Sequence, residues 1–380
     1  MTQPRDDCCP LCRIPAETVF ELQCAAKPPL ADSICFRWCP DCDFIFAQHL
    51  DAEAYRTFYR SALHDTAHVS DADTPDNLHR IQAELLCGYL GSDFRGNCLD
   101  FGSGEGQLLE RLCRLLPNAK IYATDLRNSL RSTPTAVFLE NLDSAAISFD
   151  LIVLSHVVEH FVDLSEVSKL LPHLAPGGTL YIEVPDPLGY NDCPRREFMY
   201  YFDRLHVNHF SRLALSRWLA QHSLDVTMYG THRFAYRDGK YPAQFVFATS
   251  GGNRPGPMHS TITLREAFSS YRDSEALRAK KLRELIVERA GARDFLVYGR
   301  GDNFARARSP GGPLHQLPIK AILDRNAQFL SADGSTPVVA PSIGFAEYPD
   351  AVVLMTVSAG ADIIVEDIRA RAPDRTVIMI

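Results

Sequence analysis

Two pairs of cysteines near the N-terminus have the spacing of metal-binding knuckles. The segment "CPLC" holds Cys9 and Cys12, and "CPDC" holds Cys39 and Cys42, with 26 residues between the pairs. Two thiolates at this spacing bind one tetrahedral ion, so we expect the four to hold a structural zinc ion. Reduced thiols without metal are the alternative, and a disulfide is disfavoured in the cytosol. Cys8 could replace Cys9, but a proline follows both Cys9 and Cys39, which favours Cys9.

A second candidate site is the glycine-rich turn in "LDFGSGEGQLLERL", residues 99–112. Gly102, Gly104 and Gly106 follow an apolar run, and such a turn lets a ligand approach the backbone at a helix N-terminus. The spacing is G-x-G-x-G rather than the G-x-G-x-x-G of dinucleotide-binding proteins. Asp125 follows nineteen residues later, at the end of the next expected strand, where an acid can bind a ribose diol. The turn and the acid predict an adenosine-type ligand and leave its identity open.

Two histidines form a third candidate site. His206 and His209 lie in "FDRLHVNHFS", just before an amphipathic helix expected from Leu213 onward. We expect both in a loop beyond the carboxyl end of a strand, where open α/β sheets place their chemistry. A histidine with its ordinary pKa of about 6.5 can act as a base at neutral pH. Backbone-bonded loop histidines and a two-histidine metal site are the alternatives, although no carboxylate cluster adjoins the pair.

The elements that must position these residues alternate between helices and strands. Strands are expected in "NCLDF", "AKIYATDL", "FDLIVLS" and "GGTLYIEVP", with helices between them, which predicts a mostly parallel, doubly wound sheet. A second strand–helix set follows the polar stretch "SGGNRPGPMHS". We therefore predict an α/β protein with a zinc-binding module at 1–58, a Rossmann-like domain at 59–252 and a smaller Rossmann-like α/β domain at 253–380.

Composition limits the kinds of partner. The chain has 380 residues and a net charge of -8, which argues against broad electrostatic binding to nucleic acid or anionic membranes. No apolar run approaches the roughly 20 residues that span a bilayer. The N-terminus lacks a basic-then-apolar signal, so we expect a cytoplasmic protein.

The motifs "LDFGSGEG", "ATDL", "FDLIVLSHVVEHFVD" and "LAPGGTLYIEVP" lie in this order between residues 99 and 185. Together they resemble the class I S-adenosylmethionine (SAM)-dependent methyltransferases. The resemblance implies SAM as the cofactor and gives each matching residue a role. The methionine end would lie against Asp100, Gly102, Gly104 and Gly106, the ribose against Asp125, the adenine against Leu126 and Asn141, and the sulfonium near Ser155 and His156.

The whole chain resembles the zinc-containing nucleotide-sugar C-methyltransferases, which act on nucleotide-linked 4-keto-deoxysugars. The matching segments are "CPLC…CPDC", "FDRLHVNHFS" and, more loosely, "VYGRG…LDRN". The resemblance implies that His209 removes the proton beside the ketone and that the enolate attacks the methyl sulfonium. It also places Tyr59, in "FYRSA", at the substrate.

The chain departs from this family at three places. His206 stands where the family has tyrosine, Asn208 stands where it has glutamate, and "ADGSTPVVAPS" replaces a Pro-Gly-Thr-His stretch. An O- or N-methyltransferase acting on a sugar or another polar small molecule is therefore the alternative. We expect a monomer or a homodimer. The second glycine turn, Tyr298–Asp302, either holds a nucleotide diphosphate or is structural.

Three other classes fit the sequence less well. A non-catalytic protein that uses the zinc module as an interaction surface would not need the glycine turn and Asp125. Nucleic-acid methylation is disfavoured by the acidic chain and by the absence of a Lys/Arg-rich run in residues 1–64. A dehydrogenase is disfavoured because the first glycine turn has the wrong spacing.

Overall fold

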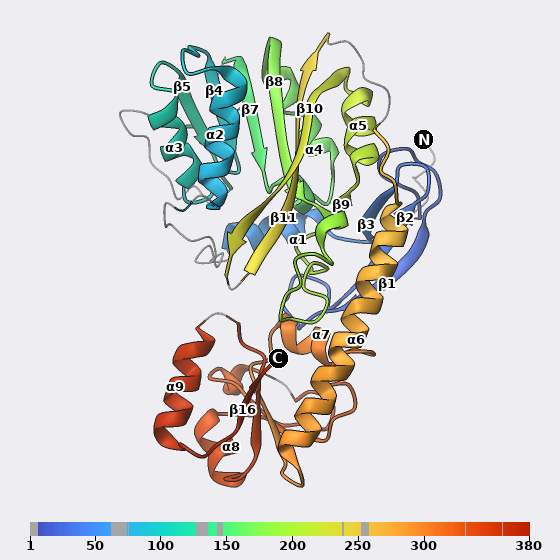
Figure 1. The fold of residues 1–380 in the computed structure, drawn as a ribbon, viewed down its shortest axis with the longest axis vertical. Coiled ribbons are helices and arrows are strands. Elements are labelled where there is room, and N and C mark those ends of the chain that lie inside the picture. Colours follow the sequence, from blue (N-terminus) through green and yellow to red (C-terminus); the bar gives the residue numbers. More distant parts are fainter. Residues whose placement is uncertain are drawn as a thin grey trace. The chain divides into compact units, whose positions relative to one another are not determined.

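The computed structural model describes residues 7–61, 74, 76–126, 136–142, 147–237, 239–251, 258–330, 332–358 and 360–380 (Figure 1). The chain forms two compact units, each built from interleaved segments. Unit 1 comprises Met1–Phe20, Cys35–Pro194 and Leu205–Phe268, and unit 2 comprises Glu21–Ile34, Arg195–Arg204 and Ser269–Ile380. The division into three domains at residues 58 and 252 stays a prediction.

The main sheet of unit 1 has seven strands in the order β10-β11-β8-β7-β4-β5-β6. The strands β4 to β8 run parallel, whereas β11 is antiparallel to β8 and β10 is antiparallel to β11. Their bounds are Asn97–Phe101 (β4), Lys120–Thr124 (β5), Ala136–Phe138 (β6), Phe149–Ser155 (β7), Leu174–Pro185 (β8), Leu224–Tyr236 (β10) and Gly239–Ser250 (β11). The predicted α/β class, with four of the strands expected from the sequence, is confirmed.

The strand order reverses beside β4. From β4 the chain adds β5 and then β6 on one side, and it returns to place β7 on the other side of β4. Ligands of open α/β sheets bind at such a switch point, in the crevice outside the carboxyl ends of the strands. The residues that follow β4 and β7 therefore lie where a ligand is expected.

Local sequence signals set the starts of the helices on this sheet. Helix α2 (Leu78–Leu90) begins after Asn77, whose side chain accepts a hydrogen bond from the backbone N–H of Arg80. Helix α3 (Gln107–Leu115) begins after a glycine, and α5 (Arg212–Gln221) begins after Ser211, which caps it in the same manner as Asn77. Helix α3 lies between two of the expected strands, and α5 matches the helix expected from Leu213 onward.

The helices cover both faces of the sheet with separate apolar clusters. One cluster joins α2 and α3 to the sheet and the other joins α5 to it. The first contains Leu86, Leu112, Cys98 and Leu151, and the second contains Ala214, Trp218, Leu154 and Ile182. Alternate residues of a strand face opposite sides, which explains why the run "LIVL" at 151–154 is apolar throughout in a sheet covered on both faces.

Unit 1 also carries a smaller antiparallel sheet near the N-terminus. Its order is β1-β2-β3-β9, with bounds Glu17–Gln23, Ser33–Cys39, Phe44–Gln48 and Asn208–Phe210. Helix α1 (Ala52–Ser61) follows β3. Strand β9 comes from the segment that was expected to be a loop, and His209 lies opposite Ile45 of β3. The prediction that His209 lies in a loop is wrong because a strand distant in sequence supplies its backbone pairing.

Unit 2 contains a five-stranded parallel sheet in the order β14-β13-β12-β15-β16. The strands span Val338–Val339, Ile319–Leu323, Phe295–Tyr298, Val352–Met355 and Val377–Met379, and the helices span Leu264–Ala290 (α6), Asp302–Arg308 (α7), Pro341–Glu347 (α8) and Ala361–Arg371 (α9). Residues such as Val297 and Leu296 belong to different apolar clusters on the two faces. The predicted second α/β set is thus present.

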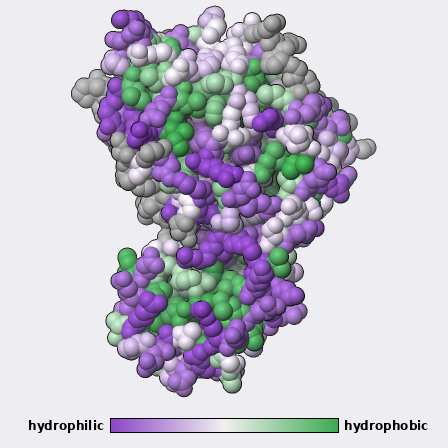
Figure 2. Space-filling view, in the orientation of Figure 1, coloured by the Kyte–Doolittle hydropathy of each residue, from purple (hydrophilic) through white to green (hydrophobic). Residues whose placement is uncertain are grey.

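Hydrophilic side chains cover much of the face seen in Figure 2, with smaller hydrophobic areas between them. Among the helices that the structure describes, none has the length and apolarity that a membrane span requires.

Gly102, in the turn after β4, has both a positive φ and a close neighbour, and the energetic cost of each can be measured. Gly102 has φ +75°, and a Cβ there would lie 2.7 Å from Cγ2 of Val157. Gly177 has the same φ, but a Cβ there would meet nothing within 4 Å. We expect Gly177→Ala to cost about 1–2 kcal/mol of unfolding free energy from backbone strain alone. Gly102→Ala should cost about 1–3 kcal/mol more from overpacking, measured by urea denaturation. Equal losses would contradict the close approach of Val157.

Candidate functional site

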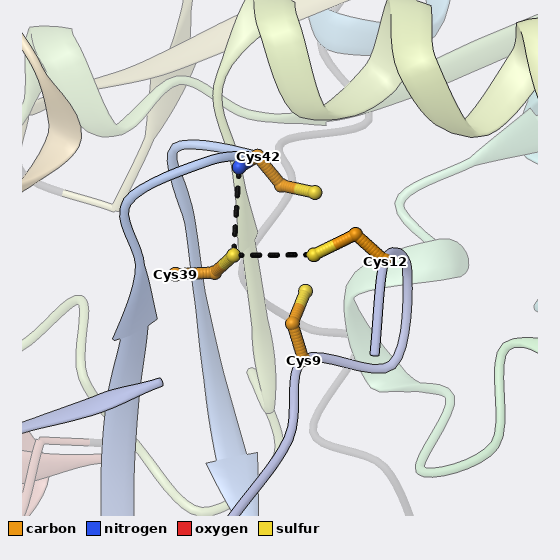
Figure 3. Close-up of side chains that lie close together, drawn as sticks. All are labelled: Cys9, Cys12, Cys39 and Cys42. Atoms are coloured by element: carbon orange, nitrogen blue, oxygen red, sulfur yellow. Dashed lines mark hydrogen bonds between the residues drawn. The ribbon is translucent and has the colours of Figure 1, made fainter. Parts of the chain in front are cut away.

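The four predicted zinc ligands lie together in the structure (Figure 3). The sulfur atoms of Cys9, Cys12, Cys39 and Cys42 all lie within 4.8 Å of one another, and Cys12 Sγ is 3.5 Å from Cys39 Sγ. The backbone N–H of Cys42 donates to Cys39 Sγ at 3.4 Å. A zinc ion 2.3 Å from each of four sulfurs places them about 3.8 Å apart, so this donor set fits zinc.

The backbone of the first glycine turn is hydrogen-bonded to the end of β5. The N–H groups of Gly102 and Ser103 donate to the carbonyl oxygen of Thr124, at 2.8 Å and 3.2 Å. The N–H of Gly104 donates to Asp125 Oδ2 at 3.0 Å. Gly106, with φ +81°, precedes the first residue of α3. The turn and its acid therefore lie side by side at the switch point, as a ligand with a ribose would require.

Asp100 is a buried carboxyl group directly before this turn. Its residue is only 3% exposed, and its Oδ2 has no hydrogen-bond partner among the residues that the structure describes. Burial, with a smaller contribution from the charge of Asp125, raises its pKa to about 7. A buried carboxylate oxygen without a partner is costly unless a ligand supplies a donor or a positive charge. The methionine end of SAM carries an ammonium group, so Asp100 fits this cofactor.

The two residues expected at the adenine are both exposed. Leu126 follows Asp125 directly and is 52% exposed, and Asn141 is exposed just after β6. An exposed leucine beside Asp125 is available to cover the face of a planar base.

The carboxyl ends of β7 and β8 share a buried network centred on Glu183. Its Oε1 accepts from Gln82 Nε2 at 2.6 Å and lies 3.2 Å from His156 Nε2, while its Oε2 lies 2.9 Å from His232 Nε2. Tyr181 donates its hydroxyl hydrogen to the same Oε2. A buried carboxylate needs this number of donors to offset its lost hydration.

The same network fixes the residues that follow β7. Ser155 Oγ accepts a second hydrogen bond from Gln82 Nε2, at 2.6 Å. His156 Nδ1 lies 3.1 Å from Glu159 Oε1. Burial lowers the pKa of His156, but the two carboxylates Glu159 and Glu183 outweigh it and raise that pKa to about 10. His156 also has φ +52°, a conformation that costs energy in a residue other than glycine.

His209 lies in the interior rather than at an open edge. It is 2% exposed, its Nδ1 is 3.0 Å from the hydroxyl of Tyr190, and its ring centroid is 5.6 Å from that of Phe36. Asn208, beside it, donates Nδ2 to the carbonyl oxygens of Val158 (3.2 Å) and Phe161 (2.7 Å). Asn208 therefore holds backbone of the segment after β7.

His206 and Tyr59 meet around a third side chain, His160. The ring centroid of His160 lies 5.0 Å from that of His206 and 5.7 Å from that of Tyr59. His160 ends the single-turn helix η1 (Val158–His160), to which Asn208 is bonded. Two of the candidate catalytic residues thus gather beside η1, whereas His209 pairs with Tyr190.

Sequence reasoning missed the roles of several polar residues: Gln82, Glu159, Glu183, Tyr190 and His232. One signal was available, because a glutamate in the middle of the apolar strand "LYIEVP" must find buried partners. The partners themselves come from distant segments and carry no local signal.

The second glycine turn, in unit 2, ends at Asp302, whose carboxylate already has protein partners. Asp302 Oδ1 accepts from the N–H of Ala25 (2.9 Å) and from Arg204 Nη2 (2.7 Å), and its Oδ2 lies 3.0 Å from Lys27 Nζ. These contacts favour the structural interpretation of the Tyr298–Asp302 turn.

Substitution of single cysteines tests whether the cluster binds zinc, and the adjacent Cys8 and Cys9 give a matched pair of variants. Cys9→Ser should lose zinc measured by metal analysis, whereas Cys8→Ser should keep it, because Cys8 is outside the four-sulfur group. We expect loss of zinc to increase hydrogen exchange in residues 7–48, and also in β9 because it pairs with β3. Unchanged zinc content in Cys9→Ser would contradict the assignment.

The raised pKa of Asp100 predicts a pH dependence for SAM binding. The ammonium group binds the carboxylate form, and a carboxyl whose pKa is about 7 is protonated below that pH. Affinity measured by calorimetry should be constant above pH 7 and fall about tenfold per pH unit below it. Asp100→Asn should weaken binding by about 10- to 100-fold and remove this dependence, while Glu110→Gln on α3 should keep both. A pH-dependent affinity that persists in Asp100→Asn would contradict the role of Asp100.

Comparison with known proteins places the central region in one functional class. Residues 64–228 match the family model described as "Methyltransferase domain". No curated protein matches the chain significantly.

Solved structures of methyltransferases share limited similarity with the chain. A 1,6-didemethyltoxoflavin-N1-methyltransferase from Burkholderia thailandensis is 15% identical, with a TM-score of 0.39, over 62% of this chain and 100% of that one. Coclaurine N-methyltransferase is 14% identical, with a TM-score of 0.35, over 48% and 75% of the two chains. A SAM-dependent methyltransferase from Methanosarcina mazei is 19% identical, with a TM-score of 0.34, over 44% and 96%.

The family match covers the glycine turn, Asp125 and the segment after β7, which are the residues that the switch point brings together. Residues 64–228 therefore form a methyltransferase domain.

Proposed function

We propose that the enzyme transfers the methyl group of SAM to the carbon beside the ketone of a nucleotide-linked 4-keto-deoxysugar. The observation that carries this proposal is the placement of His209, whose ring is held by Tyr190 in a strand bonded to the segment after β7. The resemblance of "FDRLHVNHFS" to the sugar C-methyltransferases supports the same assignment. The acceptor is a small molecule, and neither nucleic acid nor a membrane is involved.

In this proposal the switch point holds the cofactor. Asp100 receives the ammonium group, the backbone of the glycine turn lies against the methionine carboxylate, and Asp125 binds the ribose hydroxyls. Leu126 and Asn141 flank the adenine. Ser155 and His156 lie near the sulfonium, where the buried Glu183 network holds them rigidly.

The chemistry needs one base and one stabilised anion. His209 takes the proton from the carbon beside the ketone, and the electron pair of that C–H bond forms the enolate. The enolate carbon then bonds to the methyl carbon, the carbon–sulfur bond breaks, and S-adenosylhomocysteine leaves. Tyr190 fixes the ring of His209 through Nδ1. Donors near the developing oxyanion lower the barrier.

The other three candidate residues have different parts in this proposal. Tyr59 and His206 gather around His160 and contact the acceptor. Asn208 is a positioning residue, because both hydrogen bonds of its amide nitrogen go to backbone carbonyls on either side of Glu159 and His160. The C-terminal domain at 253–380 binds the substrate nucleotide or closes on the substrate.

A second candidate is methylation of oxygen or nitrogen on a sugar or another polar small molecule. The observation that favours it is the contrast in burial between the two histidines: His209 is 2% exposed, whereas His206 is partly exposed and lies beside His160. In that case His206 removes the proton from a hydroxyl or an amine.

The first test combines an acceptor panel with deuterium exchange. Purified enzyme and SAM are incubated with nucleotide-linked sugars with and without a 4-keto group, and mass spectrometry measures methyl gain. We expect methylation of keto sugars alone. Exchange of the proton beside the ketone in deuterated water should fall by about 10²- to 10⁴-fold in His209→Ala. His259→Ala, an exposed histidine, is the control.

Two results would contradict carbon methylation by His209. Methyl gain by sugars without a ketone would favour oxygen or nitrogen as the acceptor, with His206 as the base. Deuterium exchange that persists in His209→Ala would remove His209 from the role of base even if the keto sugar is methylated.

A further inference from the structure

A carboxylate and two imidazoles from different segments meet beside the end of β7. One ligand atom each from Glu159, His160 and His206 lies within 4.8 Å of the other two. Glu159 is fully buried; its Oε1 contacts His156, while its Oε2 has no hydrogen-bond partner in the described parts of the chain. A buried carboxylate oxygen without a donor is costly, and a cation at this point would remove that cost.

The hydrogen bond of His160 to a backbone carbonyl indicates which ring nitrogen carries the proton. Its Nδ1 lies 2.9 Å from the carbonyl oxygen of Leu205. A carbonyl oxygen only accepts, so Nδ1 carries the proton, and in the neutral ring Nε2 retains its lone pair. This Nε2 is 4.0 Å from Glu159 Oε1. Histidines that bind metals commonly donate their other ring nitrogen to a backbone carbonyl in this manner.

The two segments that carry the ligands are already tied together. Asn208 donates to the carbonyl oxygens of Val158 and Phe161, which flank Glu159 and His160 in sequence. The bond from His160 to Leu205 makes a third link, next to His206. Ligand atoms bound to one ion lie about 2.0–2.2 Å from it, so the three side chains must move closer together than their present spacing of up to 4.8 Å.

We propose that Glu159, His160 and His206 bind one divalent first-row transition metal ion, separate from the four-cysteine site. Imidazole and carboxylate ligands suit Zn²⁺ and Fe²⁺. Three protein ligands leave coordination positions open, as in catalytic rather than structural sites. If the proposed function holds, an oxygen atom of the acceptor takes an open position, and the ion stabilises the negative charge that develops there. Binding of the ion itself does not depend on the acceptor.

The experiment measures metal binding by the full-length enzyme without SAM or acceptor. Protein is dialysed to equilibrium against Zn²⁺ under reducing conditions, and bound zinc per chain is determined by mass spectrometry of the metal. We expect His160→Asn and His206→Asn each to bind one equivalent less than the wild type. His259→Ala, which changes an exposed histidine elsewhere, should bind the same amount of zinc as the wild type. Cys9→Ser should lose the zinc ion of the four-cysteine site and keep the one at the histidines.

A spectroscopic readout on the wild type covers the case in which a variant does not fold. Zinc first fills the cysteine site in an NMR titration of the wild type. Further Zn²⁺ should then shift the ring proton signals of two histidines, and only two. The proposal is overturned if wild type and both histidine variants bind equal amounts of zinc, or if no histidine signal shifts. An enzyme that loses the equivalent in both variants but methylates no keto sugar would support this site and contradict the proposed acceptor.

Discussion

The arrangement of residues at the carboxyl ends of β7 and β8 depends on the interactions of the buried carboxylate of Glu183. This carboxylate lies in the interior of a seven-stranded sheet, where a charge without partners would be prohibitively costly. Gln82 of helix α2 and His232 of strand β10 each hydrogen-bond to it, and His156, directly after β7, lies 3.2 Å from it as an ion-pair partner. Because all three must reach one carboxylate, the network fixes how these elements meet. It thereby offsets the strained backbone of His156 beside the switch point.

Pairing of β9 with β3 is the second constraint, because it connects the strand that follows the four-cysteine cluster to a segment that also contacts the end of β7. The three residues of β9 hydrogen-bond to the strand that follows Cys42, and Asn208 in β9 also bonds to the segment after β7. Strand β9 thus pairs with β3 through its backbone and contacts the segment after β7 through a side chain.

The sequence by itself determined the features that depend on local chemistry and periodicity. The α/β class, helices α2, α3 and α5, the glycine turn with Asp125, and the grouping of the four cysteines follow from apolar spacing, capping residues and ligand spacing. Each of these features is specified within a short window of residues. Parallel pairing of the strands then limits the strand orders that are possible.

Only the tertiary structure decided which polar residues meet. His206 and His209 are three residues apart in sequence, yet one lies with His160 and Glu159 and the other with Tyr190. Likewise, Gln82 and His232 are 150 positions apart and share one carboxylate. The physical reason is that a buried polar group needs a hydrogen-bond partner, and packing decides which group lies near enough to be that partner. That partner is chosen by sheet order and register, which no local window of the sequence contains.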